Sequence, residues 1–137
     1  MNIESKKLAI NTSAKMIYDF VGNFNNFSNL LPAQVEGWTS TEDACSFKVG
    51  GFVQIQLRMA EKIPYSKIVI TPDMSTASSF PFQLIITLEE KNGYTDTVVS
   101  TKIEGNSMML MMIKGKIKPA LDTMVEQLKY FAENRSR

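Results

Sequence analysis

The last stretch of the sequence, residues 107 to 132, constrains the fold more than any other segment. Its apolar residues recur at steps of four and three, the spacing of one apolar face on an α-helix. They are Ile113, Ile117, Leu121, Met124, Leu128 and Phe131. Ser107 can cap the start of this helix by accepting a backbone N–H. A helix with one apolar face needs a partner surface, and most other apolar patterns in the chain are typical of strands. We therefore expect a sheet wrapped around a C-terminal helix.

Pro119 lies inside this helical pattern, and its ring would crowd the carbonyl of Gly115, four residues earlier. The pair predicts a kink between these two positions, because Ile113 and Ile117 continue the apolar stripe found downstream. The alternative is that the main helix starts at Pro119, where a missing N–H has no cost. Residues 107 to 118 would then form a separate turn.

Two short helices are predicted between the first strand and the rest of the sheet. The first strand covers residues 3 to 10, and the two lysines inside it suit an edge position. Asn11 or Thr12 can cap the first short helix, which closes at Gly22. The second short helix follows and ends at Pro32.

From residue 34 onward the apolar period falls to two, which is typical of strands. The predicted strands cover residues 34 to 41, 44 to 49, 52 to 62, 66 to 71, 82 to 88 and 94 to 104. Residues 72 to 81 form the longest loop, and Asn92-Gly93 predicts a hairpin turn. The inner face of the strand at residues 94 to 104 stays open, because Val98 and Val99 are adjacent.

Short hairpin turns require antiparallel pairing of these strands. A curved seven-stranded antiparallel sheet with the long helix across its concave face would bury the helix stripe. The predicted fold class is therefore α+β, with residues 1 to 137 forming a single domain.

Composition excludes several classes of function. The chain has 15 Lys and Arg residues against 14 Asp and Glu, so no strong field attracts a nucleic acid. Histidine is absent, which excludes histidine-based triads and histidine-ligated metal sites. The single cysteine, Cys45, can form neither an internal disulfide nor a thiolate zinc site, and is interpreted as an inert apolar residue. We expect no metal and no cofactor.

The sequence contains no apolar signal core and no run long enough to cross a bilayer. We expect a cytoplasmic protein with no integral membrane segment and no nucleic-acid partner. The four methionines between residues 108 and 112 surround most of the helix, so they cannot all face the sheet. At least one is expected to be exposed, in a loop contact or in an oligomer interface, which leaves a homodimer open.

Several soft motifs accompany this order of elements. They are Asn11 to Val21, Phe27 to Pro32, Phe47-Lys48-Val49-Gly50, Asn92-Gly93-Tyr94-Thr95 and Ile117 to Leu128. With them, essentially the whole chain resembles the START-like superfamily, also called SRPBCC, which has the helix-grip fold. The resemblance is to its bacterial polyketide cyclase/dehydrase and lipid-transport-like branch. None of the motifs is a catalytic signature, and the fold hosts many unrelated activities.

The resemblance implies a pocket between helix and sheet for a sterol, lipid, polyketide or similar apolar molecule. Its walls would be the inward apolar residues Trp38, Val53, Ile55, Leu57, Met59, Ile68, Ile70, Phe82, Leu84, Ile86, Leu110, Ile113, Ile117 and Met124. Its mouth would lie among Gly50-Gly51, the loop at residues 72 to 81 and residues 105 to 107. The leading hypothesis is a non-catalytic binder or carrier of a small apolar molecule.

Two alternatives come from other functional classes. A cyclase or dehydratase would need a proton-transfer group in the pocket, and only Tyr18, Tyr65, Tyr94 and Asp96 are loosely placed for that role. A protein-interaction module would have a filled core and a polar convex surface. Arg58 would become a pocket cation only if the opposite face of its strand were turned inward, so it is predicted to be solvated.

Overall fold

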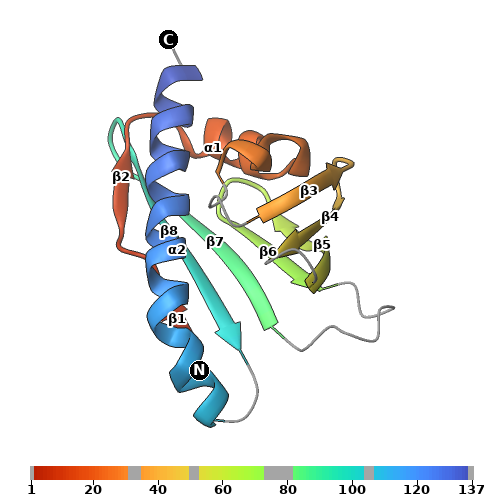
Figure 1. The fold of residues 1–137 in the computed structure, drawn as a ribbon. Coiled ribbons are helices and arrows are strands. Elements are labelled where there is room, and N and C mark those ends of the chain that lie inside the picture. Colours follow the sequence, from red (N-terminus) through yellow and green to blue (C-terminus); the bar gives the residue numbers. More distant parts are fainter. Residues whose placement is uncertain (1, 31–34, 50–52, 73–81, 104–106, 136–137) are drawn as a thin grey trace.

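The structure is a computed structural model that describes residues 2–30, 35–49, 53–72, 82–103 and 107–135. In this part of the chain, a curved antiparallel sheet of eight strands carries a long C-terminal helix across its concave face (Figure 1). The strand order is β1-β8-β7-β6-β5-β4-β3, and β2 also pairs with β8. The predicted α+β helix-grip architecture is confirmed.

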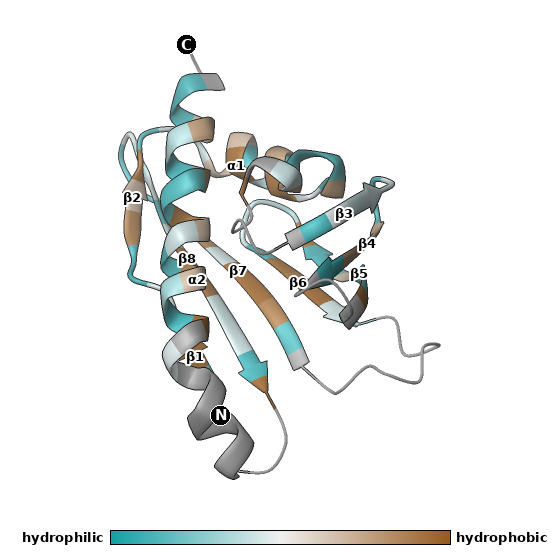
Figure 2. Ribbon diagram, viewed as in Figure 1, coloured by the Kyte–Doolittle hydropathy of each residue, from teal (hydrophilic) through white to brown (hydrophobic). Residues whose placement is uncertain are grey.

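The elements follow the predicted order closely. Their bounds are β1 (Asn2–Glu4), β2 (Leu8–Ile10), α1 (Ala14–Val21), the 3₁₀ helix η1 (Phe24–Asn29), β3 (Val35–Ser40), β4 (Ala44–Val49), β5 (Val53–Ile63), β6 (Lys67–Pro72), β7 (Phe82–Glu90), β8 (Thr95–Ile103) and α2 (Ser107–Arg135). In Figure 2, β7 is largely apolar and β8 is mostly pale, whereas polar residues occupy much of the visible, coloured side of α2.

The predicted first strand is in fact two short strands, which raises the strand count from seven to eight. Between them, the Ser5 N–H donates to the Val99 carbonyl at 2.8 Å. The Val99 N–H donates to the Ser5 hydroxyl oxygen at 3.0 Å, so a side chain replaces the backbone acceptor there. The chain therefore leaves the regular ladder for three residues while staying attached to β8. The predicted edge position of this segment is confirmed.

The first short helix starts one or two residues later than predicted. Its N-cap is Ser13, and not Asn11 or Thr12, because the Ser13 hydroxyl accepts the N–H of the residue three positions on. Gly22 closes the helix as predicted, and its N–H donates to the Tyr18 carbonyl at 2.8 Å. The second predicted helix is the 3₁₀ helix η1. Together, α1 and η1 cover one end of the sheet (Figure 1).

The structure shows which side chains of β8 face the core, a point that the sequence analysis left open. The buried residues of this strand are Thr95, Thr97, Val99, Thr101 and Ile103. Val98 therefore lies on the outer face and Val99 on the inner face. Arg58 is exposed on the outer face, as predicted, opposite Thr71 of β6.

Helix α2 is continuous from Ser107 to Arg135 and passes through Pro119. The alternative of a separate turn before Pro119 is therefore wrong, whereas the bend predicted near Gly115 stays a prediction. The buried stripe of the helix is Leu121, Met124, Val125, Leu128 and Ala132. Within the described residues, no helix has the length and apolar character needed to span a membrane.

Side chains of α2 bond to the backbone of the β1–β2 segment. The bonds run from the Lys6 N–H to Asp122 Oδ1 (2.7 Å), from the Asn11 N–H to Glu133 Oε2 (2.9 Å), from Lys118 Nζ to the Glu4 carbonyl (3.1 Å) and from Lys129 Nζ to the Ala9 carbonyl (2.7 Å). Lys6 also forms an ion pair with Glu126. These contacts satisfy backbone groups at an edge of the sheet, and they fix the helix across it.

Candidate functional site

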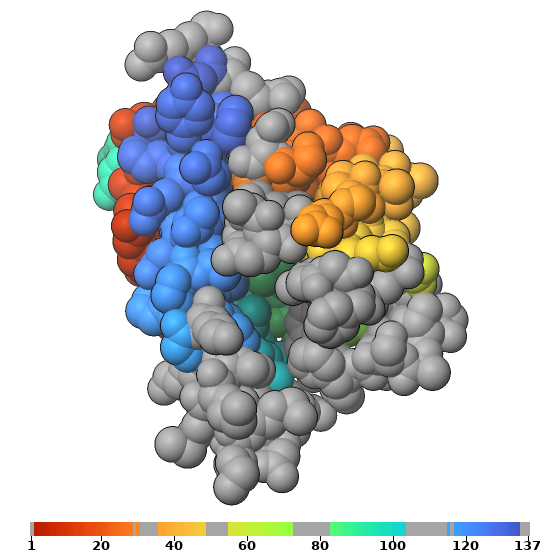
Figure 3. Space-filling model, in the orientation of Figure 1, coloured from red at the N-terminus to blue at the C-terminus, as the bar shows by residue number. Residues whose placement is uncertain are grey.

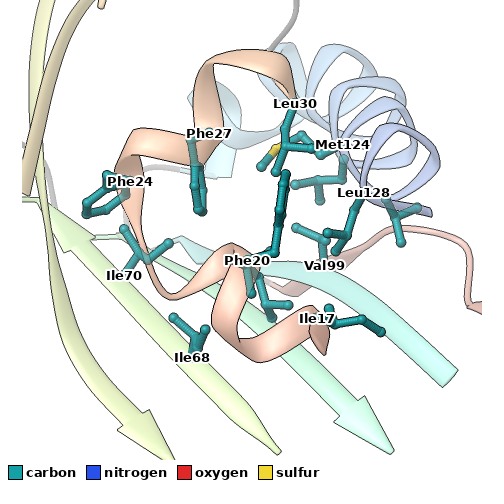
Figure 4. Packing of buried hydrophobic residues seen from close by; sticks show 14 of the residues in the cluster. Ile17, Phe20, Phe24, Phe27, Leu30, Ile68, Ile70, Val99, Met124 and Leu128 are labelled. Atoms are coloured by element: carbon teal, nitrogen blue, oxygen red, sulfur yellow. The ribbon is translucent and has the colours of Figure 1, made fainter. Parts of the chain in front are cut away.

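One end of the concave face is filled with side chains. Figure 4 shows residues of α1 and η1 pointing toward residues of the sheet and of α2. The labelled residues are Ile17, Phe20, Phe24, Phe27, Leu30, Ile68, Ile70, Val99, Met124 and Leu128, and all of them are buried. We call this group, together with Ile86, the filled end. These side chains belong to the described apolar core, and they close this end of the concave face.

Farther along the same face, several inward apolar side chains keep part of their exposure. Ile55, Met59, Leu84 and Ile117 pack against the core but are only partly buried. Figure 3 shows a recess beside α2 in which atoms of β7 and β8 are visible. We call this region the central hollow. The partly buried inward side chains of β3, β5, β7 and α2 on this face are Trp38, Ile55, Met59, Leu84 and Ile117.

The predicted pocket residues fall into three groups. Leu57, Ile68, Ile70, Ile86 and Met124 are buried in the core. Trp38, Ile55, Met59, Leu84 and Ile117 are partly buried and pack against the core. The side chains of Val53, Phe82, Leu110 and Ile113 lie outside the described residues, as do those of the four methionines at 108 to 112 and most of the predicted mouth. The structure therefore brings the first two groups to one concave face.

Trp38 is held by aromatic contacts at the β3 side of this face. Its ring stacks on Phe47, with centroids 5.5 Å apart and planes 23° apart. It also lies parallel to Phe27, with centroids 6.4 Å and planes 3° apart, and its centroid is 6.3 Å from that of Phe24. The indole Nε1 is buried, yet it has no hydrogen-bond partner among the described residues. An indole nitrogen only donates, so the group that it lacks is an acceptor.

The threonines of β8 were not among the predicted site residues. The Thr95 hydroxyl donates to the Thr12 carbonyl at 2.8 Å, and the Thr97 hydroxyl donates to the Thr95 carbonyl at 3.3 Å. The Thr101 hydroxyl is also buried but has no partner in the described part of the chain. Thr101 lies beside Leu84 of β7 on the inner face of the sheet. The signal that could have found these residues is the run of β-branched side chains at alternate positions from Thr95 to Thr101.

The groups considered for proton transfer do not meet on the concave face. Tyr18 and Tyr65 form an edge-to-face pair, with centroids 5.5 Å apart, where α1 meets the β5–β6 turn. Asp96 lies on the outer face, directly opposite Glu89 of β7. Burial raises the pKa of the Cys45 thiol to about 12, so this thiol stays protonated and is a poor nucleophile. In the described part of the chain, no cluster of His, Cys, Asp and Glu side chains is suited to hold a metal ion.

Other depressions lie away from the central hollow. One of about 340 Å³ runs along β3, β4 and β5 and is lined mainly by hydroxyl and amide side chains such as Thr39, Ser46 and Gln56. Another of about 310 Å³ lies on the outer face and includes Glu89 and Asp96. Hydroxyl and amide groups line much of the first, and charged side chains line much of the second, so neither is the mainly aliphatic pocket predicted from the sequence.

No protein-family model matches the sequence, and no curated protein matches it. Solved structures do share the fold over nearly the full length. Protein MLL2253 from Mesorhizobium loti matches with a TM-score of 0.74 at 8% identity, covering 100% of this chain and 99% of that one. TTHA0849 from Thermus thermophilus matches with a TM-score of 0.72 at 9% identity, covering 100% of both chains. The KanY protein matches with a TM-score of 0.75 at 11% identity, covering 97% of both chains. At such low identity these likenesses show the fold alone.

Proposed function

We propose that this chain is a START-like protein that binds or carries a small, mostly apolar molecule in the central hollow. The observation that carries the proposal is the partial exposure of Ile55, Leu84 and Ile117 on the concave face. Side chains that point toward the middle of a domain are normally covered by other side chains. Here they border a hollow, while the filled end of the same face is closely packed.

The free energy for binding would come from removing apolar surface from water. Burial of apolar surface contributes about 25 cal/mol per Å², and a pocket lined mostly by aliphatic and aromatic groups suits a molecule of the same character. With few polar groups around the hollow, selectivity would depend mainly on shape. A carrier fits better than an enzyme, because the tyrosines and Asp96 lie off this face and Cys45 is protonated.

Titration with Nile red, an uncharged dye that fluoresces in apolar surroundings, tests this proposal. Ile55→Trp and Leu84→Trp each place a larger side chain at the hollow, so both variants should bind the dye at least tenfold more weakly than wild type. Ile63→Trp is the matched control, since Ile63 is on the same strand as Ile55 but 40% exposed. This control should bind the dye as wild type does.

Circular dichroism and urea unfolding of each variant would show that the fold is retained. If the wild-type protein gives no fluorescence increase with the dye, the proposed function is wrong. It is also wrong if both tryptophan variants at the hollow bind the dye as tightly as the control.

A further inference from the structure

We propose that two copies of this chain pair face to face through the outer, convex surface of the sheet, with Lys102 of each copy close to Asp96 of the other. The proposal does not depend on a ligand in the central hollow, because it concerns the opposite side of the sheet. Among the described elements, α1, η1 and α2 lie on the concave side (Figure 1). None of these helices covers the outer side chains of β5 to β8, so this surface is open to a partner.

The middle of the outer surface is apolar. Val69 of β6 lies directly opposite Ile85 of β7, and Val98 of β8 is a diagonal neighbour of Ile85. Val69 is 6% exposed, whereas Ile85 and Val98 are partly exposed. Two charged residues beside this group, Glu61 and Lys67, have opposite signs and are diagonal neighbours across β5 and β6. An apolar centre with charges around it is the usual arrangement of a protein interface.

The charges of β7 and β8 differ between the two ends of this surface. At one end, Lys102 is exposed, and its cross-strand neighbours Asn2 and Gln83 are uncharged. At the other end, Asp96 lies directly opposite Glu89. Asp96 and Lys102 are six residues apart on β8, which corresponds to about 20 Å along an extended strand. Along these two strands, the surface is therefore basic at one end and acidic at the other.

Asp96 is the carboxylate of the acidic end that lacks an ion pair. Lys91 forms an ion pair with Glu89, and Lys7 acts on the same Glu89 carboxylate. None of the ion pairs among the described residues includes Asp96 or Lys102. Like charges that lie directly opposite each other on neighbouring strands destabilise a sheet, so a further cation beside Asp96 and Glu89 would be favourable. The depression of about 310 Å³ at this end, which both carboxylates line, has room for a lysine side chain.

Two-fold symmetry can bring the basic end of one copy onto the acidic end of the other. Sheets that stack face to face keep their strand directions within about 30° of each other. If the two-fold axis lies in the interface and runs across the strands, the strands of the second copy point the opposite way. Lys102 of each copy then lies over Asp96 of the other, and symmetry forms this contact twice. An axis parallel to the strands would place like ends together, which repulsion disfavours.

A second copy is the partner that fits, because this one surface carries both halves of the charge pattern. Four strands about 4.8 Å apart give a small contact area, and small interfaces are typical of transient complexes. We therefore expect a weak dimer that forms at high protein concentration.

Sedimentation velocity over about 5–500 µM, a range that covers weak complexes, tests the proposal. Wild type should shift from monomer to dimer within this range. Lys102→Glu and Asp96→Lys each create two repulsive contacts in the dimer, so each variant alone should associate at least about tenfold more weakly. An equal mixture of the two variants should dimerise as wild type does, because every contact again joins opposite charges.

Lys48→Glu is the matched control, because Lys48 is an exposed lysine on the outer surface of β4, away from β7 and β8. It should dimerise as wild type does, and circular dichroism would show that every variant is folded. The proposal is wrong if wild type stays monomeric throughout the range, if Lys102→Glu and Lys48→Glu associate equally, or if the mixture associates as weakly as its two components. Nile red binding should not change in the charge variants, so loss of the dimer leaves the carrier function standing.

Discussion

Two residues of β7 provide a direct measure of how unequally the concave face is packed. Leu84 and Ile86 are on the same strand and the same face, and truncation of either to alanine deletes the same number of carbon atoms. Ile86 is 1% exposed and lies between the buried residues Ile68 and Val99. Leu84 is partly buried and borders the central hollow. The two substitutions therefore compare the filled end with the hollow.

The expected losses follow from burial. Removing three buried carbon groups costs about 2.5 kcal/mol at about 0.8 kcal/mol each, and the closed cavity left at Ile86 should bring the loss to about 3–4 kcal/mol. At Leu84 part of the side chain already contacts water, and the space left behind joins the hollow. We therefore expect Leu84→Ala to cost about 1–1.5 kcal/mol.

Urea unfolding followed by circular dichroism and by Trp38 fluorescence measures both losses, and coincidence of the two signals supports two-state behaviour. The whole β-propensity scale covers about 1 kcal/mol, so a difference of about 2 kcal/mol between the variants would reflect packing. If Leu84→Ala is as costly as Ile86→Ala, the concave face is filled at both ends and the hollow is not a feature of the folded chain.

Two further predictions concern α2 and the turns. Asp122→Asn should lower stability by about 1 kcal/mol, because the carboxylate accepts the Lys6 N–H and its pKa is lowered chiefly by that bond. Because this pKa is lower in the folded state, the charged carboxylate stabilises the fold at pH values above its unfolded pKa of about 3.9. Urea unfolding should therefore show the full loss of stability for Asp122→Asn at pH 7 and a smaller loss as the pH falls through the folded pKa. Asp19→Asn is the control, because it removes an exposed ion pair with Lys15 and should cost less than about 0.5 kcal/mol. If Asp19→Asn and Asp122→Asn lower stability equally, the backbone hydrogen bond of Asp122 does not have the role inferred for it. Gly115→Ala should raise stability by about 0.5–1 kcal/mol, because Gly115 is helical and an added Cβ meets open space. Gly93→Ala should lower stability by about 1 kcal/mol, because Gly93 has a φ of 87° that alanine adopts poorly. Thermal unfolding measures both changes, and shifts of the same sign would refute this reasoning.

Features that depend on local sequence could be predicted. The period of two placed the strands to within one or two residues, and the apolar stripe placed α2. Gly22 was correctly assigned to the end of α1, because a glycine after an apolar periodic run is a local signal. These features need no knowledge of which other residues lie nearby.

Features that depend on distant partners were missed. The break between β1 and β2 exists because Ser5 bonds to Val99 on β8, far along the chain. The inner face of β8 follows from its pairing with β7, and adjacent valines in the sequence give no sign of it. The division of the concave face into a filled end and a hollow depends on where α1 and η1 place their rings. The helical period of the apolar residues predicts that these rings are buried, but it does not predict which part of the sheet they contact.

The same division explains how the fold can carry a hollow and remain stable. The rings of α1 and η1 are inserted at one end of the sheet, where they are buried against β6, β8 and the C-terminal half of α2. At the β1–β2 edge, side chains of α2 bond to the backbone, so the helix is fixed without needing contacts along its whole length. The inward residues near Leu84 and Ile117 are therefore not needed to hold the helix against the sheet. Because the closely packed contacts and the hollow lie at different ends of one face, substitutions at the hollow can change its shape while the fold is preserved.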